Sequence, residues 1–500
     1  MNIIETRRLT KRFGNMTAND GIDFAVKQGE IHAIIGENGA GKSTLMNMLY
    51  GLLQPDEGEI YIRGQKTRIT SPKVAIQLGI GMVHQHFKLV PSLTIAENIL
   101  LSSEPIKSGF IDKKKSLEIV ERLIREFGFV MNPKDRIRDV SVGVQQRVEI
   151  LKMLYRDVDI LILDEPTAVL TPQEVDELLV SLRHLKNKGK TIIIITHKLG
   201  EVKRCSDTVT VIRHGKVVNT VKTSDVEEKD LANMMVGRDV LLRVEKQERR
   251  PGNVIYEVKG LSTKDNRGVK VVDNVSFHVR EGEIVGFAGV EGNGQSELMK
   301  ILSGLWRATE GSVTFMGRDI TNAMPRKLRE LGIGIVPEDR YEHGSCKTMT
   351  IAENLIAGYH YRKPFTRWGF LRSKEITAHA ERLKNRFDVR AATLQQHVGS
   401  LSGGNAQKVI IARELSMNPK VLIVSQPTRG VDIGSIEFIH QQIIKSRDEG
   451  KAVILISSEL SEIMNLSDRI LVMYKGSVIG EFPAKDVTQE KLGYLMAGIP

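Results

Sequence analysis

One stretch decides the fold of this chain: Gly36-Glu37-Asn38-Gly39-Ala40-Gly41-Lys42-Ser43. It follows an apolar run at 30–35 and opens a helical pattern near Thr44, which is the setting that a phosphate-binding loop requires. Its glycines let backbone N–H groups wrap a phosphate, and the N-terminus of the next helix adds a favourable dipole. We expect Lys42 to reach the β- and γ-phosphates of a nucleotide and Ser43 to ligate Mg²⁺.

A second motif supplies the acidic groups that such a loop needs. The apolar run 160–163 ends in Asp164 and Glu165. A buried strand of this kind delivers both carboxylates to its C-terminal end, where ligands bind in α/β sheets. We expect Asp164 to hold Mg²⁺ and Glu165 to orient or deprotonate the attacking water. Similar runs alternate with helical patterns such as 172–187, so the sequence predicts layered α/β domains.

The chain also repeats itself, which sets its domain organisation. Residues 79–83, Gly-Ile-Gly-Met-Val, recur 253 residues later as Gly-Ile-Gly-Ile-Val, and Pro166-Thr167 recurs 261 residues later. The stretch between the two halves is polar and contains the breakers Pro251 and Gly252, as expected of a linker. The predicted divisions are a first domain at 1–236, a linker at 237–253 and a second domain at 254–498.

Composition limits the class of protein. Of the 500 residues, 41% are hydrophobic and 27% are charged, which is enough apolar material for large cores. No apolar run approaches the ~18 residues that a membrane span needs, and the N-terminus lacks the pattern of a secretory signal. The net charge of +11 could suit nucleic acid, an anionic membrane surface or anionic ligands. With only 5% aromatic residues and no long basic block, we expect no nucleic-acid partner.

Three further features resemble the ATP-binding cassettes of membrane transporters. Gln85 follows a strand, Asp164-Glu165-Pro166-Thr167 forms one run, and His197 follows an apolar strand, like the Q-loop, Walker B motif and H-loop of that family. The resemblance implies a RecA-like α/β core with a helical subdomain and an antiparallel β subdomain. It implies that Gln85 binds Mg²⁺ and water and that His197 contacts the γ-phosphate. It also implies that Phe13 stacks on adenine, although a core-packing phenylalanine is the alternative. The ATP-binding residues expected in this half are Phe13, Gly36, Glu37, Asn38, Gly39, Ala40, Gly41, Lys42, Ser43 and Thr44.

The signature motif of the same family is intact only in the second half. There the chain reads Leu401-Ser402-Gly403-Gly404-Asn405-Ala406-Gln407. Its serine, its glycines and the following helix N-terminus suit a γ-phosphate, so Ser402, Gly403, Gly404 and Asn405 are expected ATP ligands. The first half has Val142 where close backbone approach is wanted.

The nucleotide-binding motifs fail in the opposite half. Gln295 replaces the lysine of the loop, Glu291 adds a negative charge, Ser425-Gln426 replaces the acidic pair, Glu338 replaces Gln85 and Ser458 replaces His197. Asp432 of the second half fits the family's D-loop, whereas Thr171 stands there in the first. Random decay would not sort itself this way. We therefore expect an internal pseudo-dimer of the two halves with one catalytic and one degenerate site.

This fused, asymmetric layout resembles the ATPase subunit of bacterial importers of simple sugars and nucleosides. Residues 83–87 with Val90-Pro91, and 425–430, resemble the nucleoside-type members more than the ribose or galactose members. The resemblance implies ATP and Mg²⁺ as cofactors and a peripheral location on the cytoplasmic face of the cell membrane. Its implied partners are two membrane-spanning permease subunits and an extracytoplasmic solute-binding protein.

Two alternatives come from other classes. A soluble tandem-cassette translation factor that acts on the ribosome would suit the basic charge, but such proteins resemble two competent cassettes joined by a long charged helical linker. A binding module without turnover is the other, and Glu165 and His197 argue against it. The identity of the solute is expected to lie in the permease and the binding protein rather than in this chain.

Overall fold

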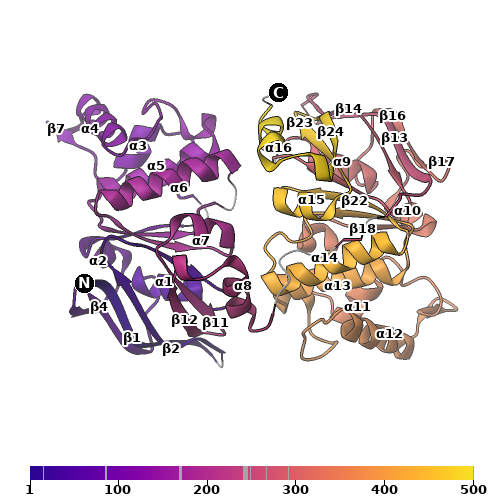
Figure 1. Cartoon of the computed structure of the whole chain (residues 1–500), viewed down its shortest axis with the longest axis horizontal. Helices are drawn as coiled ribbons and strands as arrows, with labels where there is room; N and C mark the ends of the chain where they lie inside the picture. The colour runs from indigo at the N-terminus through magenta and orange to yellow at the C-terminus, as the bar shows by residue number, and fades with distance from the viewer. Residues whose placement is uncertain are drawn as a thin grey trace. The chain divides into compact units, whose positions relative to one another are not determined.

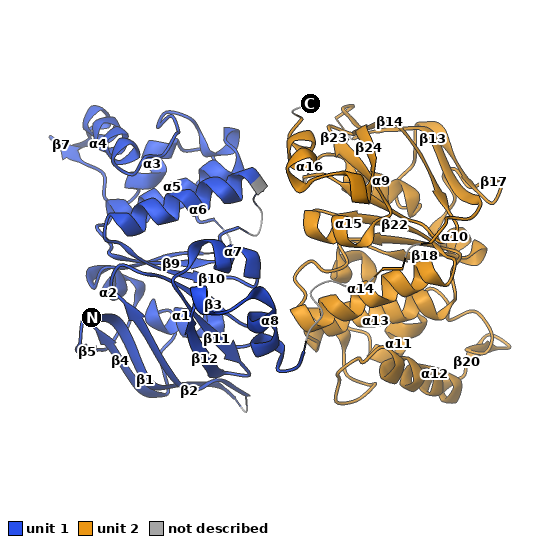
Figure 2. Cartoon of the chain, in the orientation of Figure 1, with its two compact units in different colours: residues 1–240 blue, residues 241–500 orange. Residues whose placement is uncertain are grey.

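The computed structural model describes residues 1–14, 16–84, 87–167, 170, 172–239, 246–247, 249–265, 267–290 and 292–498. The chain divides into two compact units, unit 1 with residues 1–240 and unit 2 with residues 241–500 (Figures 1 and 2). Each unit has its own sheets and cores. Among the described residues, no helix combines the length and apolar character needed to cross a membrane.

A six-stranded sheet forms the centre of unit 1. Its strands are β3 (Ile31–Ile35), β6 (Ile80–Val83), β9 (Ile160–Asp164), β10 (Thr191–Ile195), β11 (Thr208–Arg213) and β12 (Lys216–Lys222). They lie in the order β12-β11-β3-β10-β9-β6, and all are parallel except the edge strand β12. β3 and β10 are buried along their whole length, which explains their runs of isoleucine.

A second, antiparallel sheet covers one face of this core. Its order is β2-β1-β4-β5, with β1 at Asn2–Phe13, β2 at Met16–Lys27, β4 at Glu57–Ile62 and β5 at Gln65–Thr67. Alternate residues of β2 are buried, as expected of a strand with one face on a core. Helix α1 (Lys42–Leu49) contributes Leu45 and Met46 to the same apolar cluster as β1 and β3. The phosphate loop therefore leads from the central strand into a helix packed between the two sheets.

Helices form the remaining part of unit 1. A second apolar cluster joins the other face of the parallel sheet to α3, α4, α5 and α6. Ser141 caps α5 by accepting a hydrogen bond from the Val144 amide. Their bounds, with those of α2, α7, α8 and a short hairpin, are α2 (Pro72–Gln77), α3 (Ile95–Leu100), α4 (Lys113–Glu126), α5 (Val142–Tyr155), α6 (Pro172–Asn187), α7 (Leu199–Cys205), α8 (Glu228–Val236), β7 (Ile106–Lys107) and β8 (Phe110–Ile111).

Unit 2 repeats this plan element by element. Its strands are β13 (Val254–Lys264), β14 (Lys270–Arg280), β15 (Ile284–Ala288), β16 (Glu310–Phe315), β17 (Arg318–Asp319), β18 (Ile333–Val336), β19 (Thr366–Arg367), β20 (Phe370–Leu371), β21 (Val421–Ser425), β22 (Ala452–Ser457), β23 (Arg469–Tyr474) and β24 (Ser477–Pro483). Its helices are α9 (Gln295–Leu302), α10 (Pro325–Leu331), α11 (Ile351–Ile356), α12 (Ser373–Arg386), α13 (Gly403–Ser416), α14 (Ile433–Asp448), α15 (Leu460–Leu466) and α16 (Gln489–Met496). The sheet orders β18-β21-β22-β15-β23-β24 and β14-β13-β16-β17 match those of unit 1. The predicted fold, two tandem α/β cassettes, is confirmed.

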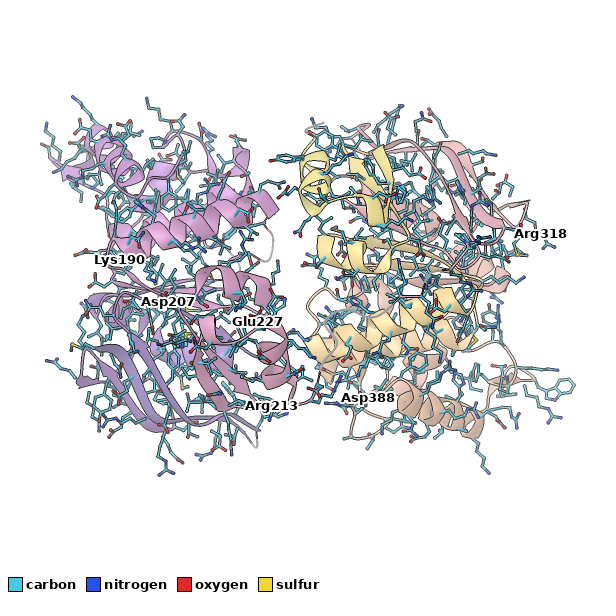
Figure 3. The ribbon with its side chains drawn as sticks, viewed as in Figure 1. Lys190, Asp207, Arg213, Glu227, Arg318 and Asp388 are labelled. Atoms are coloured by element: carbon cyan, nitrogen blue, oxygen red, sulfur yellow. The ribbon has the colours of Figure 1, made fainter. Side chains whose placement is uncertain are left out.

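In both units an aspartate that directly precedes a neighbouring strand binds the start of the central strand. In unit 1 this residue is Asp207, which Figure 3 labels. The Ile31 amide donates to its carboxylate at 2.8 Å, and the Lys186 ammonium pairs with the other oxygen at 2.6 Å. In unit 2 the Ile284 amide donates to Asp468 at 2.8 Å. The strand that leads into each phosphate loop is thus held at its start by the same interaction, and this positions the site.

Candidate nucleotide-binding site

The phosphate loop of unit 1 links β3 to α1 and depends on its glycines. Gly39 and Gly41 have φ angles of +81° and +102°, which L side chains rarely adopt. A Cβ on Gly41 would lie 2.4 Å from the Ala18 carbonyl oxygen, and one on Gly36 would lie 2.2 Å from the Ile212 carbonyl oxygen. Close packing against β2 and β11 therefore requires glycine at both ends of the loop.

Lys42 lies at the centre of this loop. Its ammonium donates to the carbonyl oxygens of Gly36 at 2.8 Å and Glu37 at 3.0 Å. Its side chain is only 6% exposed, and this burial lowers the pKa of Lys42, while the charges of Glu165 and Asp164 act in the opposite direction. A buried cation next to carbonyl groups and a helix N-terminus is well suited to hold an anion such as a phosphate.

The two carboxylates predicted from sequence meet this loop. Asp164 ends β9, and its carboxyl forms a hydrogen bond with the Ser43 hydroxyl. Burial raises the pKa of Asp164, and the negative charge of Glu165 raises it further, while Lys42 acts to lower it. A half-buried carboxylate beside a serine hydroxyl provides the oxygen donors that Mg²⁺ prefers. Lys42, Ser43 and Asp164 thus come together as expected, and the residues present fit the metal.

Glu165 and His197 form the second half of the cluster. The Glu165 carboxylate lies 3.0 Å from Nδ1 of His197, because the parallel neighbours β9 and β10 end at the same edge of the sheet. This hydrogen bond lowers the pKa of Glu165, which keeps the carboxylate ionised. The backbone of Glu165 has a φ of +47°, a strained conformation for a residue other than glycine. The fold therefore enforces a specific direction for this side chain.

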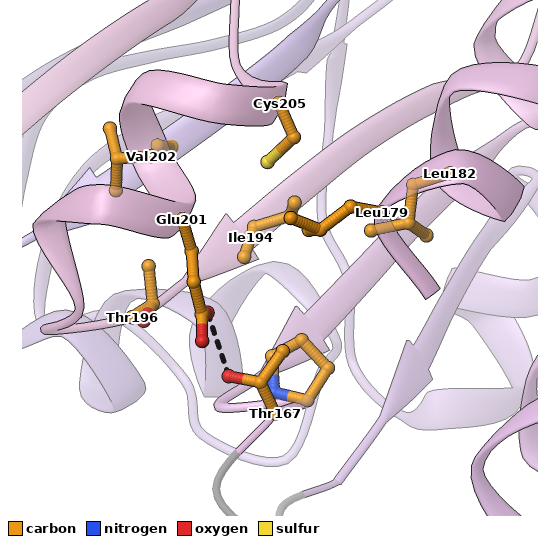
Figure 4. Close-up of a pocket in the computed structure, with 10 residues that line it drawn as sticks. Thr167, Leu179, Leu182, Ile194, Thr196, Glu201, Val202 and Cys205 are labelled. Atoms are coloured by element: carbon orange, nitrogen blue, oxygen red, sulfur yellow. Dashed lines mark hydrogen bonds between the residues drawn. The ribbon is translucent and has the colours of Figure 1, made fainter. Parts of the chain in front are cut away.

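A buried hydrogen bond, missed by the sequence analysis, holds the segment after Glu165. The Thr167 hydroxyl donates to the Glu201 carboxylate of α7 at 2.7 Å, at the side of a small pocket that also contains Cys205 (Figure 4). Unit 2 has the same pair, Thr428 and Glu462, at 2.8 Å, and in both units the partners are 34 residues apart. The recurrence of both residues 261 positions later is the sequence signal that could have indicated this hydrogen bond.

The remaining predicted residues of unit 1 fall into two groups. Phe13 ends β1 and is 43% exposed, which rules out the alternative of a core-packing side chain. Its stacking on adenine stays a prediction. Gln85 and Thr171, like Glu291 of unit 2, lie outside the described residues.

The signature of unit 2 is closely packed at its glycines. Ser402 caps α13, and its hydroxyl oxygen accepts from the Asn405 side chain at 2.9 Å, which directs the hydroxyl proton elsewhere. A Cβ on Gly403 would lie 2.6 Å from Nη1 of Arg340, and one on Gly404 would lie 2.5 Å from the Ser435 hydroxyl. The glycines are therefore needed for packing inside unit 2, and their role in the approach of a ligand stays a prediction.

The corresponding motif of unit 1 is already occupied by a carboxylate of its own chain. Glu174 of α6 accepts hydrogen bonds from the Ser141 hydroxyl at 2.9 Å and from the Gly143 amide at 3.2 Å. These are the donors that a signature would offer to a phosphate. The altered signature of unit 1 therefore has these donors paired with a carboxylate of its own chain, and a negative charge there opposes an anionic ligand.

The degenerate loop of unit 2 satisfies its polar groups internally. Gln295 is buried and donates to the Phe287 carbonyl oxygen at 2.9 Å. The Ser296 hydroxyl donates to Glu338 at 2.6 Å, and Glu338 pairs with Arg429 at 3.1 Å. The Gln426 side-chain oxygen accepts from the Ser458 hydroxyl at 3.1 Å. Neutral side chains, Gln295, Gln426 and Ser458, thus stand where unit 1 has Lys42, Glu165 and His197. The ion-paired Glu338 stands at the position of Gln85.

Comparison with known proteins agrees with this geometry. The family model described as ABC transporter matches residues 19–168 and 272–429, one stretch in each unit. The nucleoside import ATP-binding protein NupA of Lactococcus lactis subsp. cremoris is 51% identical, over 99% of this chain and 98% of its own. The glucose import ATP-binding protein TsgD13 of Haloferax volcanii is 46% identical, over 99% of this chain and 96% of its own.

A solved structure resembles the chain over both units. It is that of the archaeal ribosome recycling factor aABCE1 with the ribosomal stalk protein aP1, with a TM-score of 0.62 over 98% of this chain and 92% of that one. At 18% identity this likeness concerns the fold alone. The family match in both units and the full-length relatives carry the assignment: the chain belongs to the ABC transporter family and is an ATP-hydrolysing member with two cassettes in tandem.

Proposed function

We propose that this chain powers the uptake of a nucleoside through a membrane transporter, using one catalytic site assembled from both units. The observation that carries the proposal is that the two units have lost complementary sets of functional groups. Unit 1 has the intact cluster of Lys42, Asp164 and Glu165, but Glu174 blocks its signature. Unit 2 has the signature sequence with an exposed Ser402, but the lysine of its own loop is replaced by the neutral Gln295. Pairing the phosphate loop and carboxylates of unit 1 with the signature of unit 2 gives a complete set of ATP-binding groups, and the opposite pairing does not.

The described side chains suggest a division of labour in that site. The loop from Gly36 to Thr44 cradles the phosphates of ATP, and Lys42 offsets the charge of the β- and γ-phosphates. Ser43 and Asp164 would hold Mg²⁺, together with Gln85 from outside the described residues, and the ion would neutralise part of the phosphate charge. Glu165 accepts the proton of the attacking water, and His197, which holds this carboxylate, contacts the γ-phosphate.

Unit 2 completes the site with the N-terminal end of α13. Ser402, Gly403, Gly404 and Asn405 cover the γ-phosphate, with the Ser402 hydroxyl and the helix N-terminus as donors. Such a cover excludes water and stabilises the charge that develops on the transferring phosphoryl group. Phe13, exposed at the end of β1, stacks on the adenine.

The solute class rests on relatives and on local sequence. A full-length relative at 51% identity is named for nucleoside import, and one at 46% for glucose import. Residues 83–87 and 425–430 favour the nucleoside type, so we propose a nucleoside. Two permease subunits and an extracytoplasmic solute-binding protein complete the transporter, and the chain lies on the cytoplasmic face of the membrane. The ribosome-factor alternative is supported only by a likeness of fold.

A matched pair of variants tests the composite site. In the transporter assembled with its permease, Ser402→Ala should lower ATP turnover by about tenfold or more, since one donor to the γ-phosphate is lost. Ser141→Ala should leave turnover within about twofold, because that hydroxyl is already bound to Glu174. Loss of activity in Ser141→Ala alone would mean that the working site is the other one. Identifying the solute that co-purifies with the partner binding protein tests the nucleoside assignment.

A further inference from the structure

Each unit carries a small β-hairpin that stands outside both sheets. The unit 1 hairpin is 106–111, formed by β7 and β8, and the unit 2 hairpin is 366–371, formed by β19 and β20. β7 lies beside α4 at an edge of unit 1, and β20 lies beside α12 at an edge of unit 2 (Figures 1 and 2). The duplication of the chain has thus kept this feature in both halves.

Both hairpins expose large apolar side chains. The exposed fractions run from 56% for Ile111 to 86% for Trp368. The set is Ile106, Phe110 and Ile111 in unit 1, and Trp368, Phe370 and Leu371 in unit 2. Scattered exposed apolar residues are ordinary, but a contiguous group of them on a protruding element marks a surface that contacts an apolar partner.

The turn of the unit 2 hairpin also places an exposed tryptophan in an unfavourable backbone conformation. Trp368 and Gly369 have φ angles of +54° and +82°, and Ser108 and Gly109 of unit 1 have +53° and +83°. Two-residue turns of this type favour asparagine, aspartate or glycine, and a bulky residue at positive φ is unusual. A tryptophan that is both exposed and in an unfavourable backbone conformation buries little of its surface within the unit, which points to a role at the surface.

The distribution of apolar groups over the hairpin faces indicates what the partner is. Ile106 pairs with Ile111 across the unit 1 hairpin, and Lys107 pairs with Phe110, so the two pairs point to opposite faces. In unit 2 Arg367 pairs with Phe370 in the same way. A protein groove would cover one face of such a ribbon, whereas a fluid lipid phase surrounds both.

The charges nearby complement an anionic surface. Residues 105–115 contain four lysines and one aspartate, and residues 363–374 contain four lysines or arginines and no acidic residue. Arg372 pairs with Glu375 at 3.0 Å, which leaves the basic excess in place. Tryptophan and phenylalanine with adjacent lysine and arginine are the residues that anchor proteins at the headgroup level of a bilayer.

We propose that the two hairpins insert their apolar tips into the headgroup region of an anionic membrane, with the flanking cations bound to lipid phosphates. Lys107 and Arg367, which share a face with a phenylalanine, reach toward the phosphates while the rings enter the interface. The proposal concerns lipid alone and does not depend on the composite ATP site or on the solute. It provides a contact with the membrane that is additional to the permease.

The chain offers a direct spectroscopic test, because it contains only two tryptophans, Trp306 and Trp368. Trp306 is packed against the unit 2 core, so Trp306→Phe leaves Trp368 as the sole tryptophan, which can be excited selectively over tyrosine. Vesicles of phosphatidylglycerol and phosphatidylcholine should shift its emission to the blue, and brominated lipid should quench it. Phosphatidylcholine vesicles should do so much less, and added salt should weaken the effect. The reverse variant, Trp368→Phe, should show no shift.

Vesicle flotation of the full chain provides the second arm. Trp368→Asn, which suits the positive φ, combined with Phe370→Ser and Leu371→Ser, should lower the affinity for anionic vesicles by about tenfold. The matched control removes the exposed Met324 and Val180, at 74% and 65% exposure, through Met324→Ser and Val180→Ser, and should bind like the wild type. Phe110→Trp in a chain without the other tryptophans reports the unit 1 hairpin.

Three results would overturn the proposal. The first is an emission of Trp368 that anionic vesicles leave unchanged. The second is a hairpin variant that floats with vesicles as the wild type does. The third is a wild type that ignores vesicles while the hairpin variant loses its permease subunits, which would make the hairpins a protein contact.

Discussion

Replacing Lys42 with glutamine would give unit 1 the residue that unit 2 already carries at the same place in its phosphate loop. Gln295 shows how a glutamine fits there, since its amide donates to a backbone carbonyl oxygen at 2.9 Å. The Gly36 carbonyl oxygen, now 2.8 Å from the Lys42 ammonium, is within reach of the new amide, although Gln295 itself uses Phe287, which corresponds to Ile34. The loop should therefore keep its fold, and the midpoint of thermal unfolding without nucleotide should move by no more than about 4 °C.

The effect on ATP should be large. The Lys42 side chain is 6% exposed, so water and salt screen its charge poorly. Removing one partner of a buried, hydrogen-bonded charge pair costs about 2–5 kcal/mol, which corresponds to roughly 30-fold to several-thousand-fold in affinity. Lys42→Gln should thus weaken ATP binding by about 100-fold or more and remove turnover with it.

The assay measures ATP affinity of the full chain by calorimetry and turnover in the assembled transporter. Gln295→Ala is the matched control in unit 2 and should change turnover by less than about twofold, while losing one buried hydrogen bond at about 1 kcal/mol. The one-site reasoning fails if Lys42→Gln keeps ATP affinity within about threefold, or if the two variants lose comparable activity.

Three further predictions concern the same chain. Glu165→Gln should lower turnover by about 100-fold or more while ATP still binds, because an amide cannot accept the proton of the attacking water; turnover near that of the wild type would remove Glu165 from this role. Thr167→Val removes one hydrogen-bond donor from the buried Glu201 carboxylate and should lower the free energy of unfolding of unit 1 by about 1–3 kcal/mol, measured by calorimetry. An unchanged unfolding profile would show that this hydrogen bond does not stabilise the unit. Gly404→Asp should stop hydrolysis by repelling the γ-phosphate, whereas Gly143→Asp should be milder; circular dichroism must accompany both, since each added side chain meets a neighbouring side chain.

Much of the site could be predicted because it follows from strand order. Asp164 ends β9 and His197 follows the end of β10, its parallel neighbour, so the sheet brings the two residues to one edge. The strand β3 lies between β10 and β11, and the phosphate loop that follows it places Lys42 at the same edge of the sheet. The fold class followed from the same alternation of buried strands and helices, and from the repeat.

Other features depend on tertiary contacts that no local pattern contains. The carboxylate of Glu174 reaches the Ser141 hydroxyl from another helix, 33 residues away in the chain. The exposure of Phe13 depends on what packs against the end of β1. The hairpins are too short, at two residues per strand, to leave a periodic signal, and their exposed apolar groups resemble core residues in sequence.

The strained backbone at Glu165 has a counterpart in unit 2 that carries no acid. Gln426 has a φ of +46°, against +47° for Glu165, and its side chain likewise meets the residue that follows the next strand, Ser458 in place of His197. The two units therefore share the backbone conformation at this position and differ in the side chains that it carries. The backbone of unit 2 thus keeps the conformation that holds the carboxylate in unit 1, so Gln426→Glu would place an acidic group there without a change of scaffold.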